Sequence, residues 1–161
     1  MIFRQARPSE TEKVFREGYR AWSRGRTYEQ YCSDNMKEDA YGSRYVIEED
    51  GEIVSSLILL DLKSFHGKAV CGIGSVIAHE GHGRKGYATE LVKQSVAGAE
   101  KDCALIFLYS DIDPAFYERF GFKALPDYLQ KKSGSVCMAR CSDDIWNKLL
   151  AGSVSDIPGY F

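Results

Sequence analysis

Between Ala69 and Tyr109 the hydrophobic pattern changes its period twice, and this change constrains the fold more than any other feature of the chain. Ala69–Ala78 is predicted as a strand, and a helix is expected over about Arg84–Lys101. Cys103–Tyr109 is a continuous apolar run, as in a strand buried on both faces. A strand, a helix and a strand in this order predict one βαβ unit with a parallel strand pair. The apolar face of the helix would consist of Ala88, Leu91, Val92, Ser95, Val96 and Ala99.

The residues before this unit predict a strand, two helices and an antiparallel meander. Ile2–Ala6 alternates as a short strand, and the two helices are expected to end near Trp22 and near Lys37. Two capping-box spacings mark the helix starts: Ser9 with Glu12, and Thr27 with Gln30. The meander strands are expected at Arg44–Glu48, Ile53–Leu62 and Ala69–Ala78, with Asp50-Gly51 at the tip of the first turn and Lys63–Lys68 as the second.

The C-terminal third predicts a short helix, two closing strands and a last helix. Asp113 is a suitable N-cap, Pro114 fits the first helical position, and Gly121 can end the helix with a positive φ. The remaining elements are expected at Phe122–Leu125, Gly134–Arg140 and Asp143–Leu150, followed by an irregular tail from about 150 to 161.

Composition excludes several classes of protein. A chain of 161 residues with 44% hydrophobic residues is expected to form one globular domain over 1–161. A net charge of −2 gives no broad attraction to nucleic acid, and no apolar run reaches the ~20 residues of a membrane span. The charged N-terminus does not resemble a signal peptide, so a cytoplasmic location is expected. The five cysteines and three histidines show no metal-ligand spacing, so no metal site is expected.

The stretch HEGHGRKGYATEL, which begins at His79, contains glycines that allow two interpretations. Gly81, Gly83 and Gly86 match a dinucleotide fingerprint, and Asp111 could be its ribose-binding acid. However, that fingerprint normally follows the first strand of a nucleotide domain, whereas helices and an antiparallel hairpin precede it here. The chain after Asp111 is also too short for the rest of a doubly wound sheet.

The second interpretation is an anion site at the start of the predicted helix. A helix N-terminus presents unpaired N–H groups and about half a positive charge. Gly83 and Gly86 let the backbone approach a phosphate, and Arg84 and Lys85 add cationic side chains. A pyrophosphate is the ligand that this arrangement suits best. The alternative is a tight connection whose basic residues only face water.

Motifs on two elements resemble those of the GNAT acetyltransferase superfamily. GRKGYATEL, from Gly83, resembles the family's coenzyme A loop, which reads Gln/Arg-x-x-Gly-x-Gly/Ala, and FYERFGF, from Phe116, resembles its F-Y-x-x-x-G-F segment. The opening IFRQARPSE resembles the family's first strand and helix cap. The resemblance implies an α+β GNAT fold: a twisted, mostly antiparallel and partly parallel sheet of six to seven strands, flanked by about four helices. The sequence departs from the family's motifs at two positions: Gly83 stands where the loop usually has Gln or Arg, and Ser110 stands where the family often has Asn.

The resemblance further implies acetyl transfer from acetyl-CoA to a primary amine, small or peptidic, through a tetrahedral intermediate. Tyr117 is then the candidate general acid, since a phenol can protonate a departing thiolate; the alternative is a core tyrosine. Val76 and Ile77 would bond the cofactor amides through their backbone, although their side chains also suit a core. The expected cofactor-binding residues are Val76, Ile77, Ala78, Gly83, Arg84, Lys85, Gly86, Tyr87, Ala88, Thr89, Ser110 and Phe116.

The general base and the acceptor are not identified by the sequence. Gly72, Gly74 and Ser75 lie on the strand where the family sometimes has a Glu, while Asp61 and Asp111 are further candidates. Aromatic residues of the first two helices and the following loop suit either a core or a cationic amine; they are Tyr19, Trp22, Tyr28, Tyr31 and Tyr41. Two other functions stay open, a coenzyme A-binding sensor without turnover and an interaction domain without cofactor. A homodimer is common in similar proteins, but no motif reports it.

Overall fold

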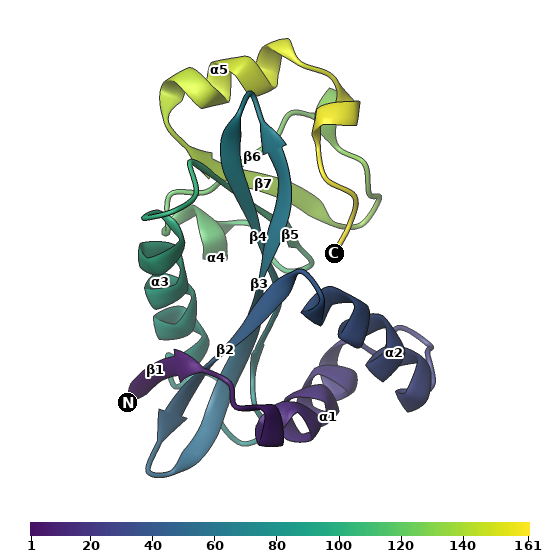
Figure 1. The fold of residues 1–161 in the computed structure, drawn as a ribbon, viewed down its shortest axis with the longest axis vertical. Coiled ribbons are helices and arrows are strands. Elements are labelled where there is room, and N and C mark those ends of the chain that lie inside the picture. The colour runs from purple at the N-terminus through teal and green to yellow at the C-terminus, as the bar shows by residue number, and fades with distance from the viewer. The chain divides into compact units, whose positions relative to one another are not determined.

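The computed structural model describes residues 1–161 and contains a seven-stranded mixed sheet with the strand order β1-β2-β3-β4-β5-β7-β6 (Figure 1). The strands are β1 (Ile2–Gln5), β2 (Gly42–Glu49), β3 (Glu52–Phe65), β4 (Lys68–Ala78), β5 (Leu105–Ser110), β6 (Lys123–Ala124) and β7 (Val136–Cys141). The helices are α1 (Thr11–Trp22), α2 (Tyr28–Asp39), α3 (Tyr87–Ala99), α4 (Ala115–Glu118) and α5 (Asp143–Ala151). This is the predicted mixed architecture, with one helix more than expected. No helix has both the length and the apolar character that crossing a bilayer requires.

The chain forms two compact units. Unit 1 consists of Met1–Leu60 and Ser75–Ser95, and unit 2 of Asp61–Gly74 and Val96–Phe161. The elements β3, β4 and α3 therefore contribute residues to both units. Each of the other nine helices and strands lies within one unit, so each unit is described by itself.

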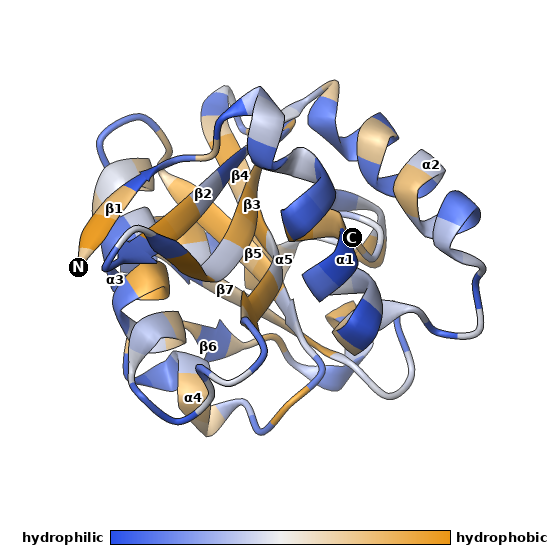
Figure 2. Ribbon diagram, turned by 90° about the horizontal axis from the view of Figure 1, so that it is seen from below, coloured by the Kyte–Doolittle hydropathy of each residue, from blue (hydrophilic) through white to orange (hydrophobic).

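Unit 1 contains an antiparallel hairpin and the first two helices. β2 pairs with β1 and with β3, and the hairpin turns at Asp50 (φ 50°) and Gly51 (φ 80°), as the sequence predicted. Val14 from α1 packs with Val46 and Ile53 of the hairpin. In Figure 2 the strands are mostly apolar, whereas α1 and α2 carry polar residues along much of their length. The helices thus bury one side against the hairpin and expose the other.

The predicted cap of the first helix is wrong and that of the second is confirmed. α1 follows a 3₁₀ turn (Pro8–Glu10), and the Glu10 carboxylate, rather than a Ser9–Glu12 pair, accepts the Arg7 N–H at 2.7 Å. Hydrogen bonds from the Arg4 guanidinium lower the pKa of Glu10 to about 2. In α2, the Thr27 hydroxyl accepts the N–H of Gln30 at 3.2 Å and the Gln30 side chain accepts the N–H of Thr27 at 3.0 Å.

Unit 2 contains the second turn of the meander, which is tighter than predicted. The strands continue to Phe65 and resume at Lys68, so the turn consists of His66 (φ 47°) and Gly67 (φ 71°) rather than all of Lys63–Lys68. A two-residue turn with positive φ angles matches the twist of the strands that it joins. The polar and glycine-containing sequence KSFHGK is typical of a loop, so the continuation of β3 and β4 into this segment was not predicted.

The βαβ prediction is confirmed, with a later helix start. β4 and β5 form a parallel ladder from Val70↔Leu105 to Ile73↔Leu108, and every residue of β5 is buried. α3 begins at Tyr87 instead of Arg84 because Arg84 (φ 60°) and Gly86 (φ 86°) adopt left-handed conformations that no α-helix contains. Leu91, Val92, Ser95, Val96 and Ala99 of its predicted apolar face are buried.

The closing strands and last helix of unit 2 lie close to their predicted positions. β7 runs antiparallel to both β5 and β6, and Gly121 (φ 84°) ends the short helix α4. The Asp113 carboxylate accepts the N–H of Ala115 at 3.0 Å, which is its predicted capping role. The tail predicted to be irregular contains a 3₁₀ turn at Val154–Asp156 and buries Ile157 to 2% exposure. The apolar core of unit 2 includes Phe65, Val70, Leu105, Phe107, Tyr109, Leu129, Cys137, Leu149 and Ile157.

Candidate functional site

β4 is irregular just before the residues that were predicted to bind the cofactor arm. Its ladder with β5 ends at Ile73, and Ser75 has a φ of 52°, which an ordinary strand residue does not adopt. Beyond this point Ile77 buries its side chain to 8% exposure, while its carbonyl accepts the Ser55 hydroxyl at 2.9 Å. Val76 and Ala78 are half-buried. The core interpretation therefore holds for the Ile77 side chain, and any cofactor contact here would use backbone groups.

The loop from His79 to Gly86 turns through three left-handed residues. Gly81 (φ 74°), Arg84 (φ 60°) and Gly86 (φ 86°) have positive φ angles, whereas Gly83 does not. A Cβ atom added at Gly83 or at Gly86 would meet nothing within 4 Å. The surface around the loop backbone is therefore open enough for a ligand to approach the main chain closely.

The loop leads into the N-terminus of α3, where hydrogen-bond donors and positive charge coincide. The first bond in this helix joins the Glu90 N–H to the Gly86 carbonyl at 2.9 Å, so the N–H groups of Tyr87 and Ala88 precede the first helical hydrogen bond. Arg84 and Lys85 are exposed beside them. A phosphate group would meet backbone donors, the helix dipole and two cations at this position.

His79 holds the start of the loop in place, a role that sequence reasoning missed. The Nε2 atom of its ring lies 2.9 Å from the Ser56 hydroxyl, and its backbone N–H donates to the Val54 carbonyl at 2.9 Å. The next N–H, that of Glu80, donates to the Glu17 carboxylate at 3.0 Å. Burial lowers the pKa of His79 to about 4, so the ring is neutral at pH 7. Its position between a strand and a glycine loop was the available signal.

The predicted general acid lies in unit 2, on α4. Tyr117 is 7% exposed, and its ring packs against Phe116 (4.9 Å between ring centroids) and Phe122 (6.4 Å). Burial, and then the nearby charge of Asp111, raise the pKa of Tyr117 to about 12. No hydrogen bond holds its hydroxyl within unit 2. The phenol is therefore protonated at pH 7, and its O–H remains available to a ligand.

Ser110, predicted to contact the cofactor, already uses its hydroxyl as a donor. The Oγ atom donates to the Ile112 carbonyl at 2.8 Å, and the residue is 2% exposed. The Ser110 carbonyl accepts the hydroxyl of Ser135 at 3.3 Å. A hydroxyl oxygen has two lone pairs, so Ser110 can still accept a hydrogen bond, but it would donate one only by giving up Ile112.

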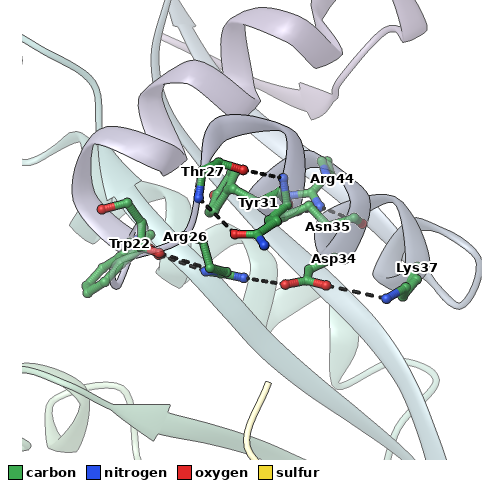
Figure 3. A network of polar contacts seen from close by, with 10 residues as sticks. Trp22, Arg26, Thr27, Tyr31, Asp34, Asn35, Lys37 and Arg44 are labelled. Atoms are coloured by element: carbon green, nitrogen blue, oxygen red, sulfur yellow. Dashed lines mark hydrogen bonds and ion pairs between the residues drawn. The ribbon is translucent and has the colours of Figure 1, made fainter.

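The aromatic residues of the first two helices form a cluster in unit 1, tied together by Arg26 (Figure 3). The Arg26 guanidinium donates to the Trp22 carbonyl at 2.8 Å, pairs with Asp34 at 3.0 Å and stacks over the Tyr31 ring at 5.0 Å. Tyr31 is 2% exposed and belongs to the core, whereas Tyr41 is 43% exposed. The core interpretation is thus correct for Tyr31 and does not apply to Tyr41.

The candidate bases differ in their surroundings. Gly72 is buried, and a Cβ atom built on it would lie 2.7 Å from the Phe161 ring, so β4 has no room for a carboxylate there. Asp61 and Asp111 are exposed. No group of three or more His, Cys, Asp or Glu side chains is arranged to hold a metal ion, and all five cysteines are free thiols.

The family comparison agrees with the loop and the fold. The sequence model of the acetyltransferase (GNAT) domain family matches residues 3–125, which begin within β1, end just after β6 and include the whole glycine loop. The chain therefore belongs to the GNAT acetyltransferase family. No curated protein matches the sequence.

Solved structures share the fold at low sequence identity. An Escherichia coli GNAT family N-acetyltransferase, YhbS, in complex with CoA is 18% identical with a TM-score of 0.71, over 91% of this chain and 84% of that one. A Brucella melitensis GNAT acetyltransferase in complex with acetyl-CoA is 20% identical with a TM-score of 0.63, over 88% and 89% of the two chains. A conserved Enterococcus faecalis protein of unknown function is 20% identical with a TM-score of 0.66 over 76% of this chain, which spans only 32% of that longer protein.

Proposed function

We propose that the protein transfers the acetyl group of acetyl-CoA to a primary amine. The observation that carries this proposal is the loop before α3, where three left-handed residues, a helix N-terminus and the exposed Arg84 and Lys85 form a cradle for a diphosphate. Membership of an acetyltransferase family supports acetyl-CoA as the diphosphate carrier. Two solved relatives in fold, described as complexes with CoA and acetyl-CoA, support the same cofactor.

The backbone of the loop would hold the diphosphate of the cofactor, and the backbone of β4 would hold its pantetheine arm. The N–H groups at the start of α3, from Gly86 to Thr89, would bind the diphosphate, with Gly83, Arg84 and Lys85 around it. The backbone of Val76, Ile77 and Ala78 would bond the amides of the pantetheine arm, since the ladder with β5 stops at Ile73. A backbone N–H in this segment would also stabilise the oxyanion of the tetrahedral intermediate. Ser110 and Phe116 are the further residues proposed to contact this arm.

Tyr117 would protonate the thiolate that leaves. The lone pair of the amine forms the new C–N bond at the thioester carbon, the C–S bond breaks, and the sulfur carries away its electron pair. The phenol gives its proton to the sulfur and regains one from the nitrogen through water. Burial raises the pKa of Tyr117 to about 12, which keeps the donor protonated, and the same burial would make the thiolate a stronger base.

A second candidate function is a coenzyme A sensor without turnover. The Ser110 hydroxyl favours it, because this hydroxyl already donates to Ile112 and offers the pantetheine arm only an acceptor. Two measurements distinguish the candidates. A rise in melting temperature with acetyl-CoA would support cofactor binding, since a ligand specific to the folded state stabilises it. Release of free thiol from acetyl-CoA that depends on an added amine would support transfer, and binding without such release would support the sensor.

A further inference from the structure

A cavity of about 270 Å³ lies in unit 2, between the turn that joins β3 to β4 and the C-terminal tail (Figure 1, yellow). One wall consists of residues 62–66, at the end of β3 and in the turn, and the other wall consists of residues 155–158 in the tail. Val70 of β4 and Phe107 of β5 complete the lining. None of these residues belongs to the proposed cofactor site, so the cavity has no role in the proposed reaction.

The inner part of the cavity is apolar. Its side chains are buried and belong to the core of unit 2; they are Phe65, Val70, Phe107 and Ile157. Leu62 and Pro158 are half-buried and line the same space. An apolar group that enters this space leaves water, which favours binding in proportion to the area that is buried. Because the cavity volume is just below the ~300–1,000 Å³ of most small-molecule sites, this group must be small.

The rim of the cavity carries two opposite charges that do not pair with each other. The exposed residues of the lining form this rim; they are Lys63, Ser64, His66, Ser155 and Asp156. The Lys63 ammonium, on the first wall, forms no hydrogen bond or ion pair with the protein. The Asp156 carboxylate, on the second wall, accepts the Ser153 N–H at 2.9 Å but pairs with no cation. Each wall therefore presents one charge that a ligand group of the opposite charge can neutralise.

The tail wall of the cavity is fixed by bonds to the rest of unit 2. The Lys131 ammonium donates to the Ile157 carbonyl, and the Tyr109 hydroxyl donates to the Pro158 carbonyl at 2.7 Å. The bond from Ser153 orients the Asp156 carboxylate in the same segment. The wall thus has its shape before a ligand enters, and binding costs little free energy for ordering the protein.

The arrangement of charge and apolar surface defines the chemistry of the ligand. Both charges lie at the rim and the apolar side chains lie inside, so a complementary ligand carries both of its charges at one end and an apolar body at the other. An ammonium or a carboxylate alone would neutralise only one of the two walls. An apolar α-amino acid has the required form, because its ammonium, its carboxylate and its side chain share one carbon atom. Asp156 can accept this ammonium, since a carboxylate offers about four acceptor positions and the Ser153 N–H takes one of them.

We propose that this cavity binds a small apolar α-amino acid as its zwitterion. The carboxylate of the ligand contacts the Lys63 ammonium, its ammonium contacts the Asp156 carboxylate, and its aliphatic side chain packs on Phe107 and Ile157. Hydrogen bonds between charged groups are stronger than neutral ones, and two of them fix the orientation of the ligand. The site goes beyond the proposed acetyl transfer and does not depend on it, because no group that lines the cavity takes part in that reaction.

The test measures the binding of L-leucine by calorimetry and by the backbone amide signals in NMR, without acetyl-CoA. Three related probes each lack one part of this ligand: isopentylamine has no carboxylate, isocaproate has no ammonium, and free glycine has no apolar body. Lys63→Met and Asp156→Asn remove the two charges of the rim, and the Asn side chain can still accept the Ser153 N–H. Lys68→Met and Asp144→Asn are the matched controls, since both residues are exposed and neither lines the cavity.

We expect L-leucine to bind about 10-fold more tightly than each probe, with amide shifts in residues 62–66 and 155–157. Lys63→Met should weaken L-leucine binding about 10-fold and leave isopentylamine binding unchanged. Asp156→Asn should weaken it by a similar factor and leave isocaproate binding unchanged, while both controls should bind L-leucine as the unchanged protein does. Absence of L-leucine binding at about 10 mM, or equally tight binding of isocaproate or isopentylamine, would overturn the inference. Neither result bears on the proposed acetyl transfer, which thiol release tests.

Discussion

The Nε2 atom of His79 lies 2.9 Å from the hydroxyl of Ser56, and both residues are buried in unit 1. His79 is the residue that precedes the glycine loop, so this bond connects the loop to β3. Burial lowers the pKa of His79 from 6.5 to about 4. In the unfolded chain the ring titrates normally, so between pH 6.5 and pH 4 the unfolded state binds more protons. Stability that is present above pH 6.5 is therefore lost as the pH falls through this window.

We expect His79 to contribute roughly 2 kcal/mol to the fall in the free energy of unfolding between pH 7 and pH 4. Urea titrations of the unchanged protein and of His79→Gln would measure it, because the stability difference between them should narrow toward pH 4. His66→Asn is the control, since His66 is exposed and Asn tolerates its φ of 47°. A constant difference across this range would show that His79 is not held neutral by burial.

Gly86 and Gly83 allow a matched test of the loop. Neither position would bring a new Cβ atom within 4 Å of another group, but only Gly86 has a positive φ, at 86°. Gly86→Ala should cost about 1 to 2 kcal/mol of stability and raise the acetyl-CoA KM more than 5-fold, because the new residue resists the left-handed conformation. Gly83→Ala should leave the stability nearly unchanged, because Gly83 has no positive φ, and should raise the acetyl-CoA KM less than Gly86→Ala does. Equal effects of the two substitutions would contradict the backbone cradle.

The exposed cation Lys85 should act on the cofactor through charge alone. Lys85→Ala is expected to raise the acetyl-CoA KM about 3-fold at low salt, and the difference should shrink as the ionic strength rises and screening increases. Lys85→Arg keeps the charge and should behave as the unchanged protein does. Initial rates at several salt concentrations would measure the effect, and a salt-independent difference would point to a structural role of Lys85 instead.

The sequence predicted the elements well where one physical signal dominated. The Asp50-Gly51 turn between β2 and β3, the apolar run of β5 and the Thr27–Gln30 cap are local patterns, and each has its predicted structure. The start of α3 differs from its prediction because the positive φ angles of Arg84 and Gly86 exclude both residues from the helix. A positive φ in a non-glycine residue such as Arg84 cannot be recognised from composition. The capping of the 3₁₀ turn before α1 by the Glu10 carboxylate was also missed, since Ser9 and Glu12 offered an equally good spacing.

The sequence could not predict those parts of the candidate site that depend on contacts between residues far apart along the chain. The sequence located the glycine loop and Tyr117 by motif. The contacts of His79 with Ser56 and of Tyr160 with Asp111 join residues that are far apart along the chain, so no local pattern predicts them. The tail carried no periodic pattern and was expected to be irregular, yet Phe161 occupies the space beside Gly72. Such packing depends on how each unit folds, and no local sequence pattern indicates it.

Tyr117→Phe tests the proposed proton donor. The substitution removes one hydroxyl and keeps the ring that packs against Phe116 and Phe122, so the fold should be preserved. We expect kcat to fall about 100-fold, within the usual range for loss of a general acid, and the acetyl-CoA KM to change less than 2-fold. An acetyl thioester of a thiol with a lower pKa should reduce the difference, because its thiolate leaves without needing a proton.

Tyr109→Phe is the matched control for this measurement. It removes another largely buried hydroxyl of unit 2, one that donates to the Pro158 carbonyl at 2.7 Å and has no proposed contact with the thiolate. This substitution should lower the stability, since the tail would be held less firmly, and its effect on kcat should be small and should not depend on the leaving thiol. If Tyr117→Phe kept the kcat of the unchanged protein with every thioester, the phenol would be a packing residue, and the thiolate would leave unprotonated or take its proton from water.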